Sequence, residues 1–173
     1  MSSGPVAGGD AGSAPGAGSA ADVVRAAVTA GLTLATAESL TAGMLAAELG
    51  TVPGVSAVLQ GGVVAYANSV KKKVLGVDGG LLETAGSVDA EVAKQMAAGV
   101  RRLLAADIGI STTGVAGPEP HDGKPVGCVF IAVAGPRQTM VREFLFTGDR
   151  AAIRRSACDE ALLMVARALA DSA

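Results

Sequence analysis

A serine, a tyrosine and a lysine supply the groups with which this chain could carry out nucleophilic chemistry. Ser39 lies where a short apolar run, 32–37, gives way to a sequence typical of a helix, 41–49. In an α/β fold this junction places the hydroxyl at the carboxyl edge of the sheet, where ligands bind, and beside the free N–H groups of a helix start. The same position also suits a serine that only caps the helix. This stretch alone leaves both roles open.

Lys71 is the candidate base for Ser39. It follows the only tyrosine of the chain, Tyr66, and is expected in the first turn of a helix that Asn68 caps. The helix dipole and partial burial would both lower the pKa of this lysine, and a neutral amine can take a proton from a serine hydroxyl. The alternative is a solvated basic run, Lys71–Lys73, with Tyr66 as an exposed aromatic residue.

The composition argues against several other kinds of site. The single histidine, His121, lies in a loop rich in proline and glycine, which disfavours a Ser-His-Asp mechanism. Cys128 and Cys158 match no metal-ligand spacing and are expected to pack as small hydrophobic residues in a reducing compartment. The net charge of −2 gives no basic footprint for nucleic acid, and no apolar run is long enough for a membrane span.

These features predict a cytoplasmic protein that acts on a small molecule, with no nucleic-acid or membrane partner and no cofactor. Residues 1–20 consist of Gly, Ala, Ser and Pro without periodicity and are expected to form a flexible tail that lacks the features of a secretory signal. Residues 21–173 are expected to form one domain. Half of the chain is hydrophobic, which favours self-association into a homo-oligomer.

The hydrophobic pattern predicts alternating helices and strands. Strands are expected at 32–37, 59–67, 107–113, 126–134 and 139–146. Helices are expected at 22–30, 41–49, 68–75, 87–104 and 149–169, with a helical turn at 81–82. The turn at 135–138 is short, so the last two strands should be antiparallel. This order indicates an α/β fold, a three-layer α/β/α sandwich with a mixed, mostly parallel sheet of about five strands.

Two arginines, Arg150 and Arg154, are expected near the start of the last helix, where a cation opposes the helix dipole. An anionic group should therefore compensate them. The candidates are Glu143, Asp149, a neighbouring subunit or a phosphorylated substrate.

Five motifs occur in order along the chain. They are Ala37-Glu38-Ser39-Leu40-Thr41-Ala42-Gly43, Gly61–Asn68 followed by Lys71, Thr113-Gly114-Val115-Ala116-Gly117-Pro118, Lys124-Pro125-Val126-Gly127 and Phe146-Thr147-Gly148-Asp149-Arg150. Together they resemble the CinA C-terminal-domain family over roughly residues 22–170. Stand-alone members of this family are nicotinamide mononucleotide deamidases.

The resemblance implies metal-independent hydrolysis of the carboxamide of nicotinamide mononucleotide to nicotinate mononucleotide and ammonia. Ser39 matches the family's nucleophile, and Lys71, through Tyr66 or directly, matches the base. The N–H groups at the start of the 41–49 helix would stabilise the oxyanion. The residues implied in substrate binding are Glu38, Thr41, Gly43, Asn68, Thr113, Gly114, Ala116 and Gly117.

The chain departs from the family pattern at two glycines. Ala42 replaces the first glycine after Ser-x-Thr, and Pro120 interrupts the family's Gly-Pro-x-Gly-Gly. A methyl group where the backbone approaches a ligand, and a proline without an N–H, bear on substrate affinity and choice. The alternative to an amidohydrolase is therefore a catalytically weak nucleotide-binding or regulatory module of the same fold. Likewise, the loop 114–117 either receives the ribose-phosphate or is only a tight turn.

Overall fold

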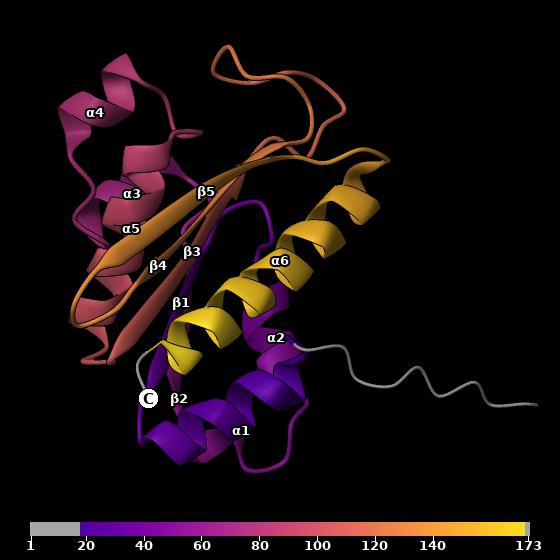
Figure 1. Ribbon diagram of the computed structural model, residues 1–173. Coiled ribbons are helices and arrows are strands. Elements are labelled where there is room, and N and C mark those ends of the chain that lie inside the picture. The colour runs from indigo at the N-terminus through magenta and orange to yellow at the C-terminus, as the bar shows by residue number, and fades with distance from the viewer. Residues whose placement is uncertain (1–17, 172–173) are drawn as a thin grey trace, which may run out of the picture.

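A five-stranded mixed sheet forms the middle layer of an α/β/α domain, as the sequence predicts (Figure 1). The computed structural model describes residues 18–171. The strands are β1 (Leu34–Glu38), β2 (Leu59–Val64), β3 (Ile108–Gly114), β4 (Cys128–Ala134) and β5 (Thr139–Leu145). They lie in the order β2-β1-β3-β4-β5. β1 pairs in parallel with β2 and β3, whereas the pairs β3–β4 and β4–β5 are antiparallel.

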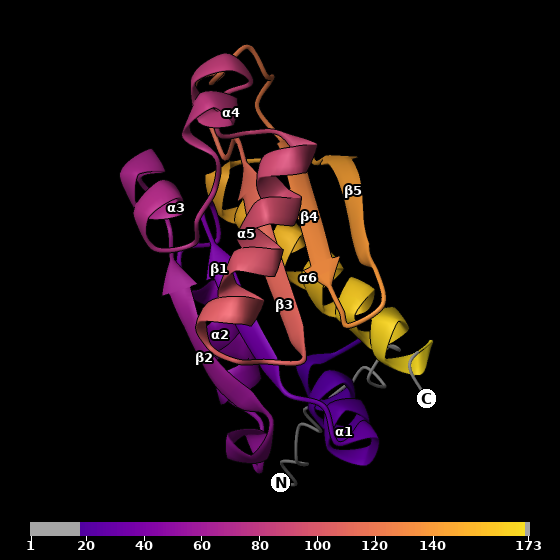
Figure 2. The ribbon, with the colours of Figure 1, turned by 90° about the vertical axis from the view of Figure 1, so that its left-hand side faces the viewer.

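Helices cover both faces of this sheet. They are α1 (Ala20–Ala30), α2 (Met44–Gly50), α3 (Asn68–Lys73), α4 (Gly79–Thr84), α5 (Ala90–Leu103) and α6 (Arg150–Ala170), with a short 3₁₀ helix, η1, at Val55–Ala57. α5 packs against β1, β3 and β4 on one face, and α6 packs against β3 and β4 on the other (Figure 2). α1 and α2 lie beside α6. No helix within residues 18–171 is long and apolar enough to cross a membrane.

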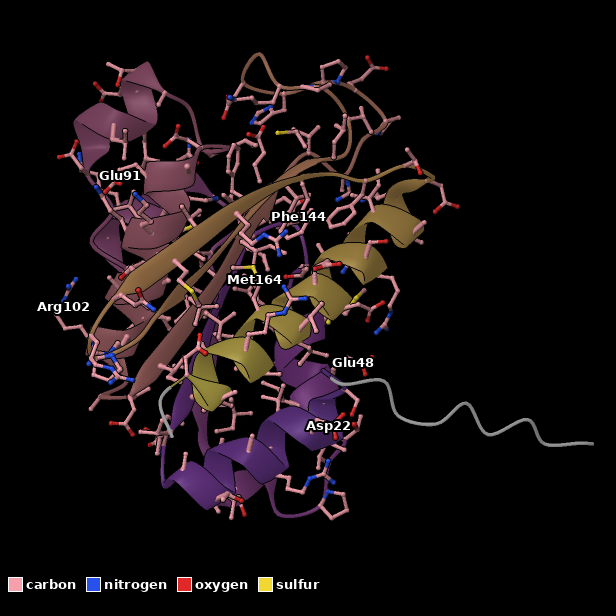
Figure 3. All side chains as sticks on the ribbon, viewed as in Figure 1. Asp22, Glu48, Glu91, Arg102, Phe144 and Met164 are labelled. Carbon is pink, nitrogen blue, oxygen red and sulfur yellow. The ribbon has the colours of Figure 1, made fainter. Side chains whose placement is uncertain are left out.

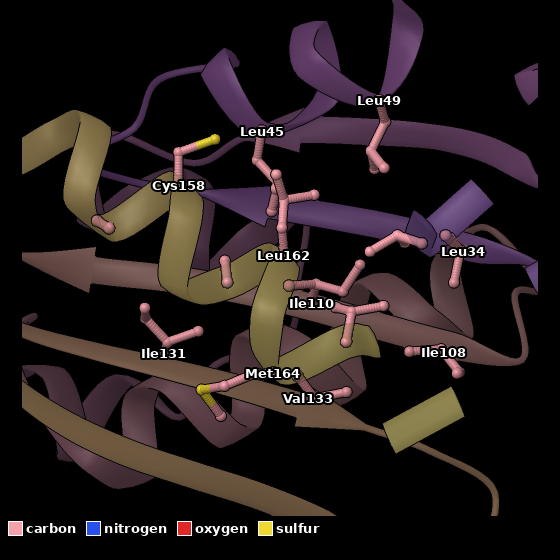
Figure 4. Packing of buried hydrophobic residues seen from close by; sticks show 14 of the residues in the cluster. Leu34, Leu45, Leu49, Ile108, Ile110, Ile131, Val133, Cys158, Leu162 and Met164 are labelled. Atoms are coloured by element: carbon pink, nitrogen blue, oxygen red, sulfur yellow. The ribbon is translucent and has the colours of Figure 1, made fainter. Parts of the chain in front are cut away.

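The larger core lies between the sheet and the α1, α2 and α6 layer. Leu34, Ile108 and Ile110 point from the strands toward Leu162 of α6 (Figure 4). Met164 of α6 belongs to the same core, and Phe144 of β5 packs against it (Figure 3). The apolar spacing of the last helix predicts a core face, and all of its members are buried: Ile153, Ala157, Ala161, Leu162, Val165 and Leu169.

In the helix expected at 87–104, the apolar spacing predicts a buried stripe of Val88, Val92, Met96, Val100, Leu103 and Leu104. The first four are buried, and Leu104 is half-buried. The prediction is wrong for Leu103, the last residue of α5, which is 49% exposed. Both cysteines are buried and free, as the sequence indicates.

Several helix starts differ from the sequence prediction. α1 begins at Ala20 with Ser19 as its N-cap, so the folded part starts within the stretch assigned to the tail, and residues 1–17 lie outside the described residues. α5 begins after Asp89, whose carboxylate caps it, instead of at Ser87. Ala67 occupies the N-cap position of α3 that was predicted for Asn68, without a side-chain hydrogen bond.

Candidate active site

Three parallel strands end together at the edge of the sheet that carries the predicted chemistry. Glu38, the last residue of β1, pairs with Val64 of β2 and with Thr112 of β3. Ser39 therefore lies at the carboxyl edge, as the sequence predicts, and its N–H donates to the Thr112 carbonyl oxygen at 2.9 Å. The loop after β3 and the first turn of α6 lie at the same end of the sheet (Figure 1).

Lys71 contacts Ser39 directly. Its Nζ donates to Ser39 Oγ at 3.0 Å, and to the backbone oxygens of Ala65 and Tyr66 at 2.9 and 3.0 Å. The lysine side chain is 1% exposed, whereas Lys72 and Lys73 lie on the surface. The alternative of a solvated basic run is thus wrong for Lys71, whereas its second part holds, because Tyr66 is 56% exposed.

Burial lowers the pKa of Lys71 to about 8, and the Asp122 carboxylate opposes this shift. The predicted contribution from the helix dipole needs correction, because α3 has only six residues and Lys71 lies in its last turn. With a pKa near 8, a substantial fraction of Lys71 is neutral at mildly alkaline pH. The amine can then take a proton from Ser39, the chemistry expected of a serine–lysine pair.

The alternative role of Ser39 as a helix N-cap is wrong. The turn Leu40–Gly43 separates Ser39 from α2, which begins at Met44 with Gly43 as its N-cap and no side-chain cap. Ala42, at the position of the family glycine, adopts φ 50°, a left-handed conformation that a side chain disfavours. It is exposed and does not line the cavity, so its methyl group affects the backbone of the turn instead of narrowing the site.

The Glu38 carboxylate binds the N–H groups at the start of α2. It accepts from Gly43 and Leu45 at 3.0 Å each, and from Ala46 at 2.9 Å. The side chain is 1% exposed, so these bonds are shielded from water. The first N–H groups of α2 are thus occupied by an anion of the protein, so of the helix start expected at residue 41 only the donors before Gly43 are left for an oxyanion.

A cavity of about 310 Å³ opens above Ser39. Of the predicted substrate-binding residues, Gly114, Ala116 and Gly117 line it, together with the candidate catalytic residues Ser39 and Tyr66. The remaining lining residues are Leu40, Ser87, Val115, Pro118, Glu119, Pro120, His121 and Arg150. A cavity of about 280 Å³ near the β4–β5 turn is lined by none of the predicted site residues.

The other predicted binding residues do not line this cavity. Thr41 and Thr112 share a hydrogen bond of 2.7 Å between their hydroxyl oxygens, and Thr113 Oγ1 donates to the Ser87 backbone oxygen at 2.7 Å. Glu38 and Gly43 bond each other as described, and Asn68 is exposed at the start of α3. In this structure the threonines, Glu38 and Gly43 therefore support the walls of the site.

The side chain of Tyr66 contacts Arg150 and not Lys71. Its hydroxyl accepts from Arg150 Nη2 at 2.7 Å, while only its backbone oxygen contacts Lys71. Arg150 Nη1 also donates to the Gly117 backbone oxygen at 2.8 Å. The predicted compensation by Glu143 or Asp149 is wrong: within residues 18–171, no ion pair involves Arg150 or Arg154.

Two further residues shape the site and were not predicted for it. The Asp122 carboxylate accepts from both the N–H and the hydroxyl of Ser87, at 2.5 and 2.9 Å, and so holds the loop after β3 against the start of α5. These residues lie 35 positions apart in the sequence. No local pattern marks such a contact.

Comparison with known proteins agrees with this architecture. The family model for the CinA C-terminal domain matches residues 17–169. A CinA-like protein from Frankia casuarinae is 52% identical over 138 residues, which cover 80% of this chain and 32% of the relative. This chain thus spans about a third of the length of the curated relatives it matches.

Solved structures also match. A CinA superfamily protein from Klebsiella pneumoniae has a TM-score of 0.85 at 35% identity, covering 88% of this chain and 96% of that one. The competence/damage inducible protein CihA from Agrobacterium tumefaciens has a TM-score of 0.81 at 34% identity, covering 90% and 97%.

Fold and site together define a three-layer α/β domain with a buried serine–lysine pair at the carboxyl edge of its sheet. The chain belongs to the CinA C-terminal domain family, as the sequence motifs indicate.

Proposed function

We propose that this chain hydrolyses the carboxamide of nicotinamide mononucleotide to nicotinate mononucleotide and ammonia. The observation that carries this proposal is the 3.0 Å contact between Lys71 Nζ and Ser39 Oγ. A buried amine beside a serine at the mouth of a cavity is suited to acyl transfer without histidine. Family membership and the five motifs support the choice of substrate.

The reaction would proceed through an acyl-enzyme. Ser39 Oγ attacks the amide carbon while neutral Lys71 takes the hydroxyl proton, which gives a tetrahedral oxyanion. The C–N bond then breaks, and Lys71 returns the proton to the nitrogen, which leaves as ammonia. A water molecule next attacks the ester carbon with Lys71 again as base, releases the carboxylic acid and restores Ser39.

Ammonia release is the direct test of this proposal. The purified protein is incubated with nicotinamide mononucleotide at pH 8, and both ammonia and nicotinate mononucleotide are measured, with Ser39→Ala as the control. Equal amounts of both products, formed only by the unsubstituted protein, would support the proposal. Stable binding of the nucleotide without either product would instead favour a nucleotide-binding module.

The observation that favours such a module is the loop that Pro120 interrupts. Pro120 lines the cavity and lacks the N–H that a glycine would offer to a ligand. Calorimetric titration with nicotinamide mononucleotide measures this binding independently of turnover. If the chain is a nucleotide-binding module, the Ser39→Ala variant should bind nicotinamide mononucleotide as tightly as the unsubstituted protein does.

Arg150 is the candidate contact for the phosphate of the substrate. Its exposed side chain lines the cavity. Two of its five N–H groups donate hydrogen bonds, to the Tyr66 hydroxyl and the Gly117 backbone oxygen. We predict that Arg150→Ala raises KM for nicotinamide mononucleotide about tenfold, because a hydrogen bond to a charged group is lost, and lowers kcat much less.

The matched substrate for this variant is nicotinamide riboside, which lacks the phosphate, and the matched control is Arg142→Ala. Arg142 lies on β5 above the ring of Phe144, away from the cavity. An equal rise in KM for the nucleotide and the riboside would rule out phosphate binding by Arg150.

A further inference from the structure

The turn that follows Ser39 offers two backbone donors with no acceptor. Within the described chain, the N–H groups of Leu40 and Thr41 have no hydrogen-bond partner, although Leu40 is 3% and Thr41 0% exposed. Buried backbone N–H groups are almost always paired, so two successive ones without a partner point to a ligand. Leu40 lines the cavity together with Ser39.

The neighbouring donors are all occupied. Ser39 N–H bonds the Thr112 carbonyl, Ala42 N–H bonds the Ser39 carbonyl at 3.1 Å, and Met44 N–H bonds the Thr41 carbonyl at 3.0 Å. Glu38 takes the next donors, as described above. Leu40 and Thr41 therefore remain as the backbone donors of this turn that can meet negative charge developing next to Ser39 Oγ.

Arg154 holds the carbonyl groups of these same two residues. From α6, its Nε donates to the Leu40 oxygen and its Nη2 to the Thr41 oxygen, each at 2.9 Å. In a trans peptide the carbonyl and the N–H point in opposite directions. Because Arg154 draws the Leu40 carbonyl toward α6, it directs the Thr41 N–H away from α6. The Ala42 N–H orients the Ser39–Leu40 peptide, and hence the Leu40 N–H, in the same manner.

This use of Arg154 is unusual for a half-buried cation. Within residues 18–171 no carboxylate lies within ion-pair distance of it, whereas its neighbour Arg155 pairs with Glu48 at 2.8 Å. A guanidinium on two successive carbonyls polarises both peptide groups and places a positive charge behind the turn. Both effects favour an anion on the N–H side of the turn.

We propose that the Leu40 and Thr41 N–H groups are the oxyanion donors for Ser39, and that Arg154 is a positioning residue that fixes the direction of the Thr41 N–H. This inference rests on the proposed acyl transfer and adds the identity and support of its oxyanion site. Donors whose direction is set before the substrate binds need no reorganisation during the reaction. The alternative is that Arg154 only ties α6 to the β1–α2 turn.

The test compares Arg154→Gln and Arg154→Lys with Arg155→Gln, the control on the same helix. Arg154→Gln should lower kcat between about tenfold and a hundredfold, less than the complete loss of an oxyanion donor, while KM and the affinity for nicotinate mononucleotide stay within about twofold. Arg154→Lys keeps the charge and should recover part of kcat. Arg155→Gln should keep full activity.

A second measurement is independent of the natural substrate. A fluorophosphonate forms a bond between Ser39 Oγ and phosphorus as fluoride leaves, with the serine proton passing to Lys71, and its phosphoryl oxygen needs the same donors. The rate of labelling, followed by intact mass, should fall in Arg154→Gln by a factor similar to that in kcat. Ser39→Ala should not be labelled.

The outcomes separate the two proposals. If the unsubstituted protein is labelled but releases no ammonia from nicotinamide mononucleotide, the proposed substrate is wrong, and the labelling rates still decide the role of Arg154. Labelling and kcat within twofold of the unsubstituted protein in Arg154→Gln, with only a lower Tm, would overturn the inference. So would a loss that Arg155→Gln shares, or the absence of labelling and turnover in the unsubstituted protein.

Discussion

Replacing Ser39 by alanine should lower kcat for amide hydrolysis about 10⁴-fold or more, with little change in the fold. The substitution removes the atom that would form the acyl-enzyme, and within residues 18–171 Ser39 Oγ is the only hydroxyl hydrogen-bonded to Lys71 Nζ. Lys71→Met should cost nearly as much, because the proton then has no acceptor. The double variant should be little worse than either single variant, since nucleophile and base act as one unit.

The stability of these variants separates catalysis from folding. Ser39 caps no helix, so Ser39→Ala should leave Tm almost unchanged. Lys71→Met replaces a buried amine by an apolar side chain of similar length and should not lower Tm. Lys72→Ala, on the exposed side of α3, is the matched control and should keep full activity. Full turnover by Ser39→Ala would contradict the mechanism, whatever its Tm.

The sequence predicted the sheet and the position of Ser39 because both depend on local patterns. Apolar runs mark β1 and β3, and residues that follow two parallel neighbours must meet at one edge of the sheet. Ser39 could be placed in this way. Lys71 could be assigned only through its spacing from Tyr66 and through the family resemblance, since one lysine in a run of three carries no local mark.

The hydrogen bonds around the turn after Ser39 could not be predicted. Glu38 was expected to bind substrate, but in the structure its carboxylate accepts hydrogen bonds from the N–H groups at the start of α2. The helix was expected from residue 41, because Thr41 and Ala42 are compatible with one. Tertiary contacts instead extend the turn to Gly43 and place Ala42 at positive φ.

Contacts between distant segments could not be predicted from the sequence either. Arg154 lies more than a hundred positions from Leu40, at a separation of 114, and binds backbone oxygens that no residue type reveals. Arg150 was expected to have an anionic partner but bonds the Tyr66 hydroxyl and a carbonyl oxygen. An arginine near a helix start indicates that its charge is compensated, but the sequence does not show which group compensates it.

The second large effect that we expect is a dependence of kcat/KM on pH. Burial lowers the pKa of Lys71 to about 8. In the proposed mechanism its neutral form is the base. We predict that kcat/KM falls about tenfold for each pH unit below 8, so activity at pH 6 should be roughly a hundredfold below the alkaline plateau. Rates measured from pH 5.5 to 9.5, in buffers of constant ionic strength, would give the apparent pKa.

The same shift makes folding stability depend on pH in a defined direction. The amine has a pKa of about 8 when folded and 10.5 ordinarily, so the unfolded chain binds more protons between these values. The contribution of Lys71 to the free energy of unfolding should therefore rise with pH from about 8 to 10.5 and be constant below 8. In Lys71→Met this contribution should be absent.

Asp122 supplies the variant that tests the cause of the kinetic pKa. Its carboxylate raises the pKa of Lys71 against the effect of burial, so Asp122→Asn should move the acid limb of kcat/KM to lower pH. The amide oxygen of asparagine can still accept from Ser87, which keeps the loop contact. Glu83→Gln removes the same charge from an exposed position on α4 and should leave the profile unchanged. An acid limb that stays in place in Asp122→Asn, or one that persists in Lys71→Met, would show that a group other than Lys71 controls the rate.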